Sequence, residues 1–385
     1  MTTIQKFEKP LGMRDTLPRQ FTHQQHIRSK AMQYVEQYGY DFIQTPSLEY
    51  FETIGKLSSL DESSLFKLVD NQGEMLVLRP DLTAPIARVA ASKLLKEKNP
   101  LRLAYSSTVF RAQQQEGGRP AEFEQFGLEL LGDTSEMADA EVISIASGLL
   151  RKLELSGFRI TIGHSAFIDH VIQTLISDEV EQSRVRTALL ERNFVGIDAW
   201  AKESPKADKF MSFFTKAIQG NKVQDLITAF PELDNDVSER FVALILTLEQ
   251  MEELQGIVQI DPLLVSHIHY YSGMVFEVYG EGTGFPLGSG GRYDGLIKEF
   301  GADVGATGFS LRLDRLLEVV GLQEPSITSH LLYTDKASYL KALQMATDFR
   351  SEGQRVTLQM KSTVNVHQEF EENFDYVTDL TGGER

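Results

Sequence analysis

The sequence contains no cysteine, and this absence excludes disulfide bonds and thiolate metal sites. It also has no apolar run long enough to span a bilayer, and its first residues, MTTIQKFEKPLGMRD, lack the apolar core of a secretory signal. These absences predict a cytoplasmic protein that does not enter membranes.

Positive charge is also scarce, with 38 Lys and Arg residues against 55 Asp and Glu and a net charge of −17. Such a chain repels polyanions unless a local basic patch overrides the overall field, and the sequence shows no such patch. Nucleic acid is therefore not expected as the main partner. The 385 residues, 42% of them hydrophobic and 24% charged, are typical of a soluble globular protein with two or three domains.

Strand-like runs dominate the first 165 residues and the stretch from 275 to 320, and helical patterns separate them. One such run, over 41–50, contains Pro46. Because proline cannot donate to a β-ladder, this strand should lie at a sheet edge or an interface. Together the runs predict an α+β fold, with a mixed, mainly antiparallel sheet and helices packed on one face.

The pattern also divides the chain. Residues 1–325 are expected to form the sheet-containing core, interrupted over about 175–257 by a helical insertion. Residues 326–385 have the order strand, helix, strand, short helix, strand, which predicts a small C-terminal α/β domain.

The run EFEQFGLELL alternates in the manner of a strand with two different faces. Every second residue from Phe126 to Leu130 is apolar and should enter a core. Gln125 and Glu129, with Gly127 between them, share the other face, where an amide, a gap and a carboxylate could form the floor of a small-ligand site. The same alternation also fits an ordinary strand with one solvated face.

Two further segments could bind a ligand. Arg111 ends a strand, and its planar guanidinium could hold a carboxylate or phosphate, although a surface hairpin with an ordinary arginine fits as well. The glycine-rich run 288–295 around Arg292 would permit close approach of a ligand to the backbone, or simply form a tight turn. Its spacing is not that of a phosphate-binding loop or a dinucleotide fingerprint.

The stretch LLVSHIHYYSGMVFEVYG places Tyr270 and Tyr271 after a histidine-rich turn. Aromatic hydroxyls beside imidazoles could carry out chemistry, or they could form a pocket that only holds a polar molecule. His267 and His269 lie two residues apart, as zinc ligands on a strand can, but no third ligand stands nearby in the sequence. We therefore expect no metal site.

Taken together, these segments resemble class II aminoacyl-tRNA synthetases, and histidyl-tRNA synthetase in particular, over about residues 5–320. YGYDFIQTPSLEYFE resembles the first class motif, which forms dimers. FRAQQQEGGRPAEFEQFGLELLG resembles the second, which holds ATP, and GATGFSLRLDRL resembles the third. YYSGMVFEV and GGRYDGL resemble the two histidine-specific motifs. The resemblance implies a class II synthetase-like fold.

The resemblance also implies a pocket for histidine. Asp81 and Thr83 would face the ligand's α-amino group, Arg111 its carboxylate, and Glu129 with Tyr271 its imidazole. The full set of candidate ligand-binding residues is Asp81, Thr83, Arg111, Gln125, Glu129, Tyr270 and Tyr271.

Departures from the synthetase motifs fall on the ATP side. Ser266 stands where the synthetase has an arginine that stabilises charge during adenylate formation, and a donor aimed at such charge is worth ~3–4 kcal/mol. Gln113 replaces an ATP-binding glutamate, and Ala121 replaces an arginine. Arg312 occupies a glycine position, where a long side chain could obstruct nucleotide. No residue is therefore expected to be catalytic.

This combination resembles the family of ATP phosphoribosyltransferase regulatory subunits, which are paralogues of histidyl-tRNA synthetase. In that family the subunit joins a short catalytic chain at the first step of histidine biosynthesis and senses the end product. The resemblance implies a non-catalytic protein without cofactor, whose partners are the short catalytic subunit, a second copy of itself and L-histidine, but not tRNA.

Two enzymatic alternatives are an active histidyl-tRNA synthetase and a histidine-activating ligase that does not use tRNA. Ser266 opposes both, because both need the missing arginine. The C-terminal unit opposes the first, since it is short and carries six Lys and Arg against nine Asp and Glu, a net charge of −3 that does not suit binding to tRNA.

Overall fold

A computed structural model describes residues 6–58, 60–112, 120–204, 206–321, 327–361 and 368–382 of the chain. It contains two compact units, Met1–Leu322 and Gln323–Arg385. The sequence pattern places this boundary three residues later, after residue 325.

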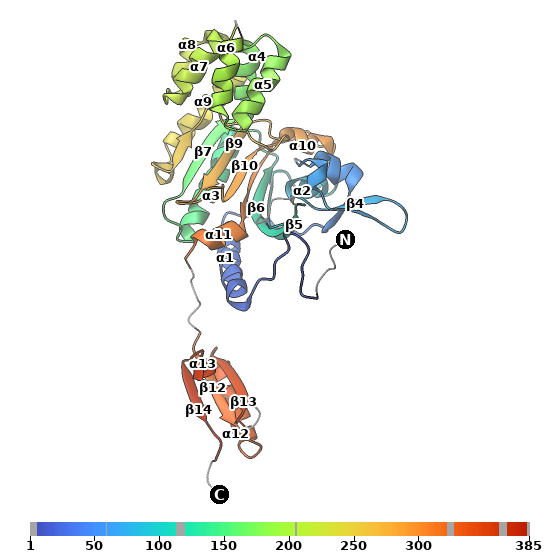
Figure 1. The fold of residues 1–385 in the computed structure, drawn as a ribbon, viewed down its shortest axis with the longest axis vertical. Helices are drawn as coiled ribbons and strands as arrows, with labels where there is room; N and C mark the ends of the chain where they lie inside the picture. The colour runs from blue at the N-terminus through green and yellow to red at the C-terminus, as the bar shows by residue number, and fades with distance from the viewer. Residues whose placement is uncertain are drawn as a thin grey trace. The chain divides into compact units, whose positions relative to one another are not determined.

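The first unit is built on an eight-stranded sheet (Figure 1) with the strand order β1-β5-β6-β11-β10-β9-β7-β8. Neighbouring strands are antiparallel except for the pairs β1–β5 and β7–β8. The predicted mixed, mainly antiparallel sheet is therefore confirmed. The strands are β1 (Asp41–Phe42), β5 (Leu101–Phe110), β6 (Glu122–Leu131), β7 (Arg159–His164), β8 (Val258–Ile260), β9 (Met274–Tyr279), β10 (Gly288–Arg292) and β11 (Ala306–Arg312).

Helices cover both faces of this sheet, so the expectation of helices on one face is wrong. On the first face the main hydrophobic core lies beneath α1 (Pro18–Glu36), α3 (Glu136–Lys152) and α11 (Leu313–Val319). On the second face α2 (Thr83–Ser92) and α10 (Asp294–Glu299) cover a separate apolar cluster. The reason is that β5 is apolar on both sides, because Leu103 and Tyr105 enter the second cluster and Ala104 enters the first.

Pro46 divides the run predicted as one strand. It lies between β1 and β2 (Leu48–Tyr50), and β2 belongs to a separate antiparallel sheet of order β2-β4-β3, with β3 (Lys67–Val69) and β4 (Met75–Leu78). The buried guanidinium of Arg79 donates from Nη1 to the carbonyl oxygens of Thr45 (2.6 Å) and Pro46 (3.3 Å). A side chain thus satisfies the backbone where proline interrupts the ladder.

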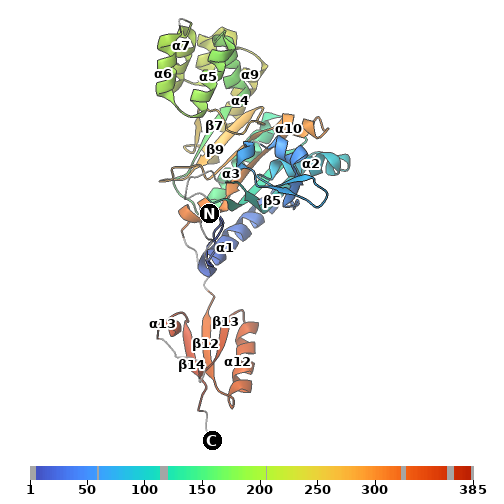
Figure 2. The ribbon, with the colours of Figure 1, turned by 45° about the vertical axis from the view of Figure 1, so that its right-hand side comes forward.

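The helical insertion has its own hydrophobic core and stands beyond the ends of β7 and β9 in both ribbon views (Figures 1 and 2). It begins earlier than the predicted residue 175, because Phe167 and Val171 of α4 pack into the insertion core. The helices are α4 (Ser165–Leu175), α5 (Glu179–Leu190), α6 (Phe194–Glu203), α7 (Asp208–Ile218), α8 (Val223–Ala229) and α9 (Asp236–Glu249).

The second unit has a three-stranded parallel sheet of order β13-β12-β14, as expected for a small α/β domain. Leu332, Ala346 and Val356 form the centre of its core. Its elements are β12 (Ser329–Thr334), α12 (Tyr339–Ser351), β13 (Arg355–Met360), α13 (Gln368–Glu371) and β14 (Tyr376–Asp379). Of the helices that the structure describes in either unit, none combines the length and apolar character needed to cross a membrane.

Candidate functional site

One cavity of about 210 Å³ on the second face of the large sheet contains all seven residues predicted from the sequence. We call it the polar cavity. The alternation predicted for β6 is confirmed, because Phe126 and Leu128 pack into the main core while Gln125 and Glu129 line the cavity. The predicted residues lie at the start of α2 (Asp81, Thr83), after β5 (Arg111), on β6 (Gln125, Glu129) and in the segment before β9 (Tyr270, Tyr271).

Glu129 lies at the buried end of this cavity, with only 1% of its surface exposed. Three hydroxyls donate to its carboxylate: Thr83 Oγ1 at 3.0 Å and Tyr105 OH at 3.3 Å to Oε1, and Tyr293 OH at 2.5 Å to Oε2. Burial raises the pKa of Glu129 to about 8, although these hydrogen bonds oppose the rise. A ligand that brings an N–H donor or a positive charge would stabilise the ionised form.

Asp81 supplies a second buried carboxylate. Its Oδ1 accepts from the backbone N–H of Ala84 at 3.2 Å, at the start of α2. Its Oδ2 is buried and has no hydrogen-bond partner within the part of the chain that the structure describes. Burial raises the pKa of Asp81, and the nearby Arg111 guanidinium opposes the rise. An unsatisfied buried acceptor in a cavity is a site where a ligand amine would gain a hydrogen bond.

Tyrosine rings form one wall of the polar cavity. The rings of Tyr270 and Tyr271 meet edge to face with centroids 5.3 Å apart, and Tyr293 lies 6.0 Å from Tyr270. The wall is held to β10 by the N–H of Ser272, which donates to the carbonyl of Arg292 at 2.8 Å. A Cβ at Gly291 would lie 2.7 Å from the carbonyl oxygen of Met274 and 3.0 Å from the Tyr271 ring, so the close packing there favours glycine.

The glycine-rich run 288–295 forms β10 and the start of α10, so the expectation of a tight turn is wrong. Gly288 and Ser289 line the polar cavity, and close approach of a ligand to this segment stays a prediction. Within β10, a Cβ at Gly288 would lie 2.2 Å from the carbonyl oxygen of Ser310 on β11. Arg292 points away from the polar cavity and donates from Nε to Asp139 Oδ2 at 3.0 Å. The glycines thus permit close approach between strands.

Sequence reasoning did not list Tyr105 and Tyr293 among the binding residues, although both donate to Glu129. Tyr293 stands in the quoted motif GGRYDGL, which was a usable signal. Tyr105 had only strand alternation to indicate it. Glu277 and Ser289 also line the cavity without having been predicted.

The segment before the tyrosines contributes Ser266 and His267 to the cavity. Ser266 Oγ accepts from the N–H of Ile268 at 3.1 Å, which shapes the turn. Across the described ranges no three His, Asp or Glu side chains form a group that could hold a metal ion. Gln113, which replaces a glutamate of the second motif, lies outside the described residues.

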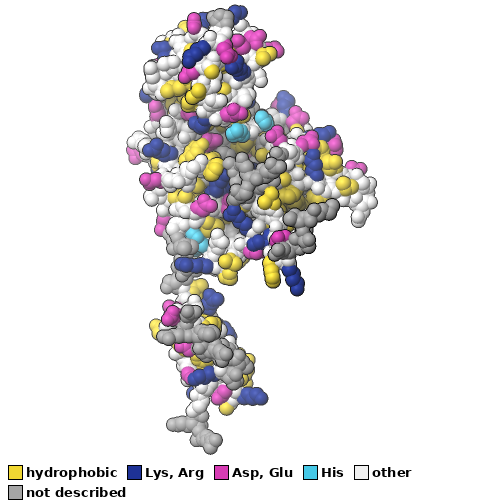
Figure 3. All heavy atoms as spheres, viewed as in Figure 1, with side chains coloured by type: hydrophobic (Ala, Val, Ile, Leu, Met, Phe, Trp, Pro, Cys, Tyr) yellow, Lys and Arg dark blue, Asp and Glu magenta, His cyan; other side chains and the backbone are white. Residues whose placement is uncertain are grey.

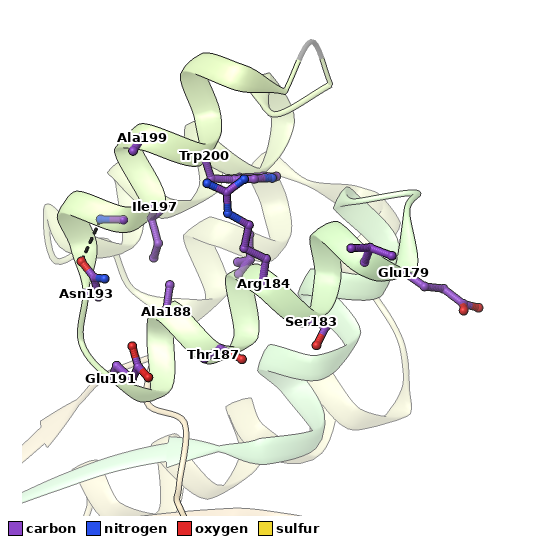
Figure 4. Close-up of a pocket in the computed structure, with 13 residues that line it drawn as sticks. Glu179, Ser183, Arg184, Thr187, Ala188, Glu191, Asn193, Ile197, Ala199 and Trp200 are labelled. Carbon is purple, nitrogen blue, oxygen red and sulfur yellow. Dashed lines mark hydrogen bonds between the residues drawn. The ribbon is translucent and has the colours of Figure 1, made fainter.

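A larger groove of about 800 Å³ lies on the insertion between α5 and α6 (Figure 4). Two of its polar side chains are already engaged: Asn193 Oδ1 accepts from the N–H of Gly196 at 2.8 Å, and Arg184 donates to Glu203 at 2.9 Å. It has no counterpart to the pair of buried carboxylates in the polar cavity. We therefore take the polar cavity as the candidate site.

Glu129→Gln should flatten the pH dependence of stability between about pH 4.5 and pH 8. The folded-state pKa of Glu129, about 8, lies above the ordinary value of 4.5, so the folded protein holds this proton more tightly than the unfolded chain. The free energy of unfolding should therefore fall as pH rises through this window, by roughly 1 kcal/mol per pH unit, and level off above it. Glutamine does not titrate, so this contribution disappears.

Urea unfolding at pH 5, 6.5 and 8.5 measures the effect. Glu122→Gln is the matched control, because Glu122 lies on the same strand and is exposed. Parallel curves for wild type and Glu129→Gln would show that Glu129 titrates normally in the folded protein.

Comparisons with known proteins first define the class. A family model described as histidyl-tRNA synthetase matches residues 12–316. The crystal structure of histidyl-tRNA synthetase from Nostoc sp. PCC 7120 has a TM-score of 0.75 at 19% identity, covering 96% of this chain and 89% of that one, and it shows the shared fold. The protein thus has the fold of a class II synthetase.

More similar relatives define the family. ATP phosphoribosyltransferase regulatory subunits from Lysinibacillus sphaericus and Bacillus subtilis are 45% and 39% identical to this chain, covering 96% and 98% of it and 97% and 98% of their own lengths. A crystal structure of an "ATP phosphoribosyltransferase regulatory subunit/histidyl-tRNA synthetase" from Bacillus halodurans has a TM-score of 0.88 at 37% identity, covering 98% of this chain and 99% of that one. The chain belongs to the family of ATP phosphoribosyltransferase regulatory subunits.

Proposed function

We propose that this chain is a non-catalytic subunit that activates a short ATP phosphoribosyltransferase catalytic chain, at the first step of L-histidine biosynthesis, and makes it sensitive to inhibition by L-histidine. The names of the relatives support the complex. The geometry of the polar cavity supports histidine as the ligand, because one buried carboxylate suits its ammonium group and another suits its imidazole.

The observation that carries the ligand is the pairing of Asp81 with Glu129 in one small cavity. The unpartnered Oδ2 of Asp81 suits an ammonium group, and the buried carboxylate of Glu129 suits an imidazole N–H. Arg111 lies in the same cavity and can face a carboxylate, while Tyr270 and Tyr271 form a wall for a flat ring. Free histidine carries all three groups: an ammonium, a carboxylate and a flat imidazole ring with an N–H.

Mixing experiments test the proposal. Phosphoribosyl transfer from phosphoribosyl pyrophosphate to ATP should appear, or rise several-fold, when the short catalytic chain is mixed with this protein, and L-histidine should suppress it. The two chains should also co-purify. An unchanged rate with this protein present would refute the activating role.

Binding of tRNA has no support in the charge distribution. Lys and Arg side chains are interspersed with Asp and Glu on the face drawn in Figure 3. Residues 326–385 carry a net charge of −3. A phosphate backbone is gripped by clustered basic residues, so we expect no tRNA partner.

We also propose that the protein forms a dimer through the small sheet β2-β4-β3. Tyr50, Leu76 and Leu68 stand opposite one another across its three strands, and Leu48 lies on the same face as Tyr50. Leu48 is 44% exposed, Tyr50 54% and Leu68 43%. Apolar side chains are visible over β4 in Figure 3. An apolar sheet face of this kind is typical of an interface, and its strand β2 lies within the segment that resembles the dimer-forming motif.

The double variant Tyr50→Glu/Leu68→Glu should therefore dissociate the dimer, because two buried charges would face each other across the two-fold axis. Sedimentation velocity at micromolar concentration measures this. Tyr339→Glu is the control, since Tyr339 is a comparably exposed tyrosine on α12 in the other unit. A monomeric wild type, or a double variant that stays dimeric, would contradict the assignment of this face.

A further inference from the structure

One continuous stretch of chain, residues 261–271, joins the helical insertion to the polar cavity, and we call it the connector. Near its start, Leu263 and Val265 are buried in the hydrophobic core of the insertion. At its end, Tyr270 and Tyr271 form the aromatic wall of the polar cavity. Because the two parts are so close in the sequence, a shift of the insertion core would be transmitted to the wall of the cavity.

A side chain forms a second link between the same two places. Arg192 lies in the turn that joins α5 to α6 in the insertion. Its Nη1 lies 3.7 Å from Asp261 Oδ2, at the start of the connector, and its Nη2 lies 3.5 Å from Glu277 Oε2 on β9. Glu277 also lines the polar cavity. Arg192 therefore contacts both a lining residue of the cavity and the origin of its tyrosine wall.

The backbone at Arg192 has a left-handed conformation, with a φ of 53°. Its N–H donates to the carbonyl of Leu189 at 3.0 Å, at the end of α5. The next N–H, that of Asn193, donates to the carbonyl of Ala188 at 2.8 Å. This pair of bonds is the Schellman arrangement, in which the left-handed position is usually glycine because a side chain is disfavoured there. A residue held in such a conformation points to a role for its side chain.

Folding stability does not account for this arginine. Its side chain is 50% exposed, and exposed ion pairs contribute little to the free energy of unfolding. Glycine would suit the backbone better. What the two contacts do is fix where the α5–α6 turn stands relative to β9 and the connector.

Glu277 is the carboxylate for which a ligand and Arg192 would compete. Its Oε2 accepts from Tyr279 OH at 2.5 Å and also faces Arg192. A cationic group in the polar cavity is attracted to this carboxylate and offsets its attraction for the guanidinium. Once the contact with Glu277 weakens, less holds the turn in its disfavoured conformation.

We propose that Arg192 is a positioning residue that couples the polar cavity to the insertion, so that a ligand in the cavity changes the packing of α5 against α6. Glu191 and Asn193, its neighbours in the chain, line the groove between these two helices (Figure 4). Coupling of this kind is reciprocal, so whatever moves the two helices changes the affinity of the cavity by the same factor. The inference rests on the proposed function in one respect, which is that histidine is the ligand.

Hydrogen exchange of the ligand-free, full-length chain tests the link itself. Arg192→Asn removes the charge, and asparagine tolerates the left-handed conformation, so the end of α5 stays intact. We expect amide exchange in the connector to be several-fold faster in this variant than in the wild type. Arg192→Gly, a second uncharged variant, should behave in the same way. Arg192→Lys should restore the wild-type rate, because lysine keeps the charge.

Arg186→Ala is the matched control. Arg186 lies on the same helix, and its Nε donates to Asp169 Oδ1 at 2.8 Å, inside the insertion. Its loss removes an arginine and an ion pair without touching the connector or β9, so exchange in the connector should stay at the wild-type rate. Near-ultraviolet circular dichroism and melting temperature establish that each variant is folded.

The single tryptophan of the chain, Trp200, reports on the other end of the link. It is buried on α6 and lines the groove between α5 and α6. L-Histidine should shift the tryptophan emission of the wild type and of Arg192→Lys. Arg192→Asn should still bind L-histidine in calorimetric titration but show no shift.

The proposal is overturned if folded Arg192→Asn and Arg192→Gly leave exchange in the connector unchanged, or if Arg186→Ala accelerates it equally. It is also overturned if Arg192→Asn keeps the shift of emission. A wild type that binds no L-histidine in the titration would refute the proposed ligand instead, and the exchange experiment, which contains no ligand, would still decide whether the link exists.

Discussion

Glu129→Ala should abolish most of the inhibition by L-histidine when the protein is assayed with the short catalytic chain. Glu129 is the buried carboxylate on which three hydroxyls converge, and its loss removes the group that we propose accepts from the imidazole. Coupling between two binding sites is typically about 1–3 kcal/mol, which corresponds to a 5- to 150-fold effect. Loss of this coupling should therefore raise the histidine concentration for half-inhibition by about 5- to 150-fold.

The measurement is phosphoribosyl transfer against histidine concentration, with each curve scaled to its own rate without histidine. Glu122→Ala is the matched control, because it removes an exposed glutamate from the same strand and leaves the cavity intact. Glu129→Gln adds a variant that keeps the shape of the side chain. Identical inhibition curves for wild type, Glu129→Ala and Glu122→Ala would mean that histidine is sensed elsewhere.

The site was predictable where local pattern and long-range geometry agree. Alternation along β6 placed Gln125 and Glu129 on one face, and this needed only the two-residue period of a strand. The gathering of Asp81, Arg111 and Tyr271 around that face came from the resemblance, since their separation along the chain carries no information about contact. The structure brings them together through α2, β5 and the segment before β9.

The hydroxyl donors to Glu129 could not be derived in this way. Tyr105 and Tyr293 lie 24 and 164 residues from Glu129, and pairing of β5 and β10 with their neighbours is what brings them close. The raised pKa of Glu129 follows from that enclosure rather than from its sequence neighbours. The tertiary fold thus determines the pKa of Glu129, although strand alternation alone had identified this residue.

Two errors in the predicted fold have the same origin. Pro46 was read within one strand, but the buried Arg79 supplies the hydrogen bonds that allow the chain to leave one sheet for another. The run around Gly288 was read as a turn, but the close approach of β11 makes glycine necessary within a strand. In each case a partner distant in the sequence determines the local structure. A window of neighbouring residues does not contain that partner, so local pattern could not predict it.

The purified chain should not form histidyl-adenylate. It should give no histidine-dependent exchange of pyrophosphate into ATP above a blank without enzyme. Ser266 lines the polar cavity at the position where the resemblance places the charge-stabilising arginine of the synthetase. Its Oγ already accepts from the N–H of Ile268, and it carries no positive charge. Loss of one such donor commonly lowers a rate by about 10²–10³-fold.

Ser266→Arg alone should not restore the exchange, because it returns one charge to a site where Arg312 and Ala121 still depart from the synthetase motifs. The guanidinium of Arg312 still covers Phe123, and its ion pair with Asp314 holds it there. Ala121, where the resemblance expects another arginine, is fully buried and offers no donor to a phosphate. Exchange assays on the wild type, Ser266→Arg and Ser266→Arg/Arg312→Gly distinguish the causes. Exchange by the wild type would refute the non-catalytic assignment. Exchange by Ser266→Arg alone would show that the missing arginine by itself accounts for the lost reaction.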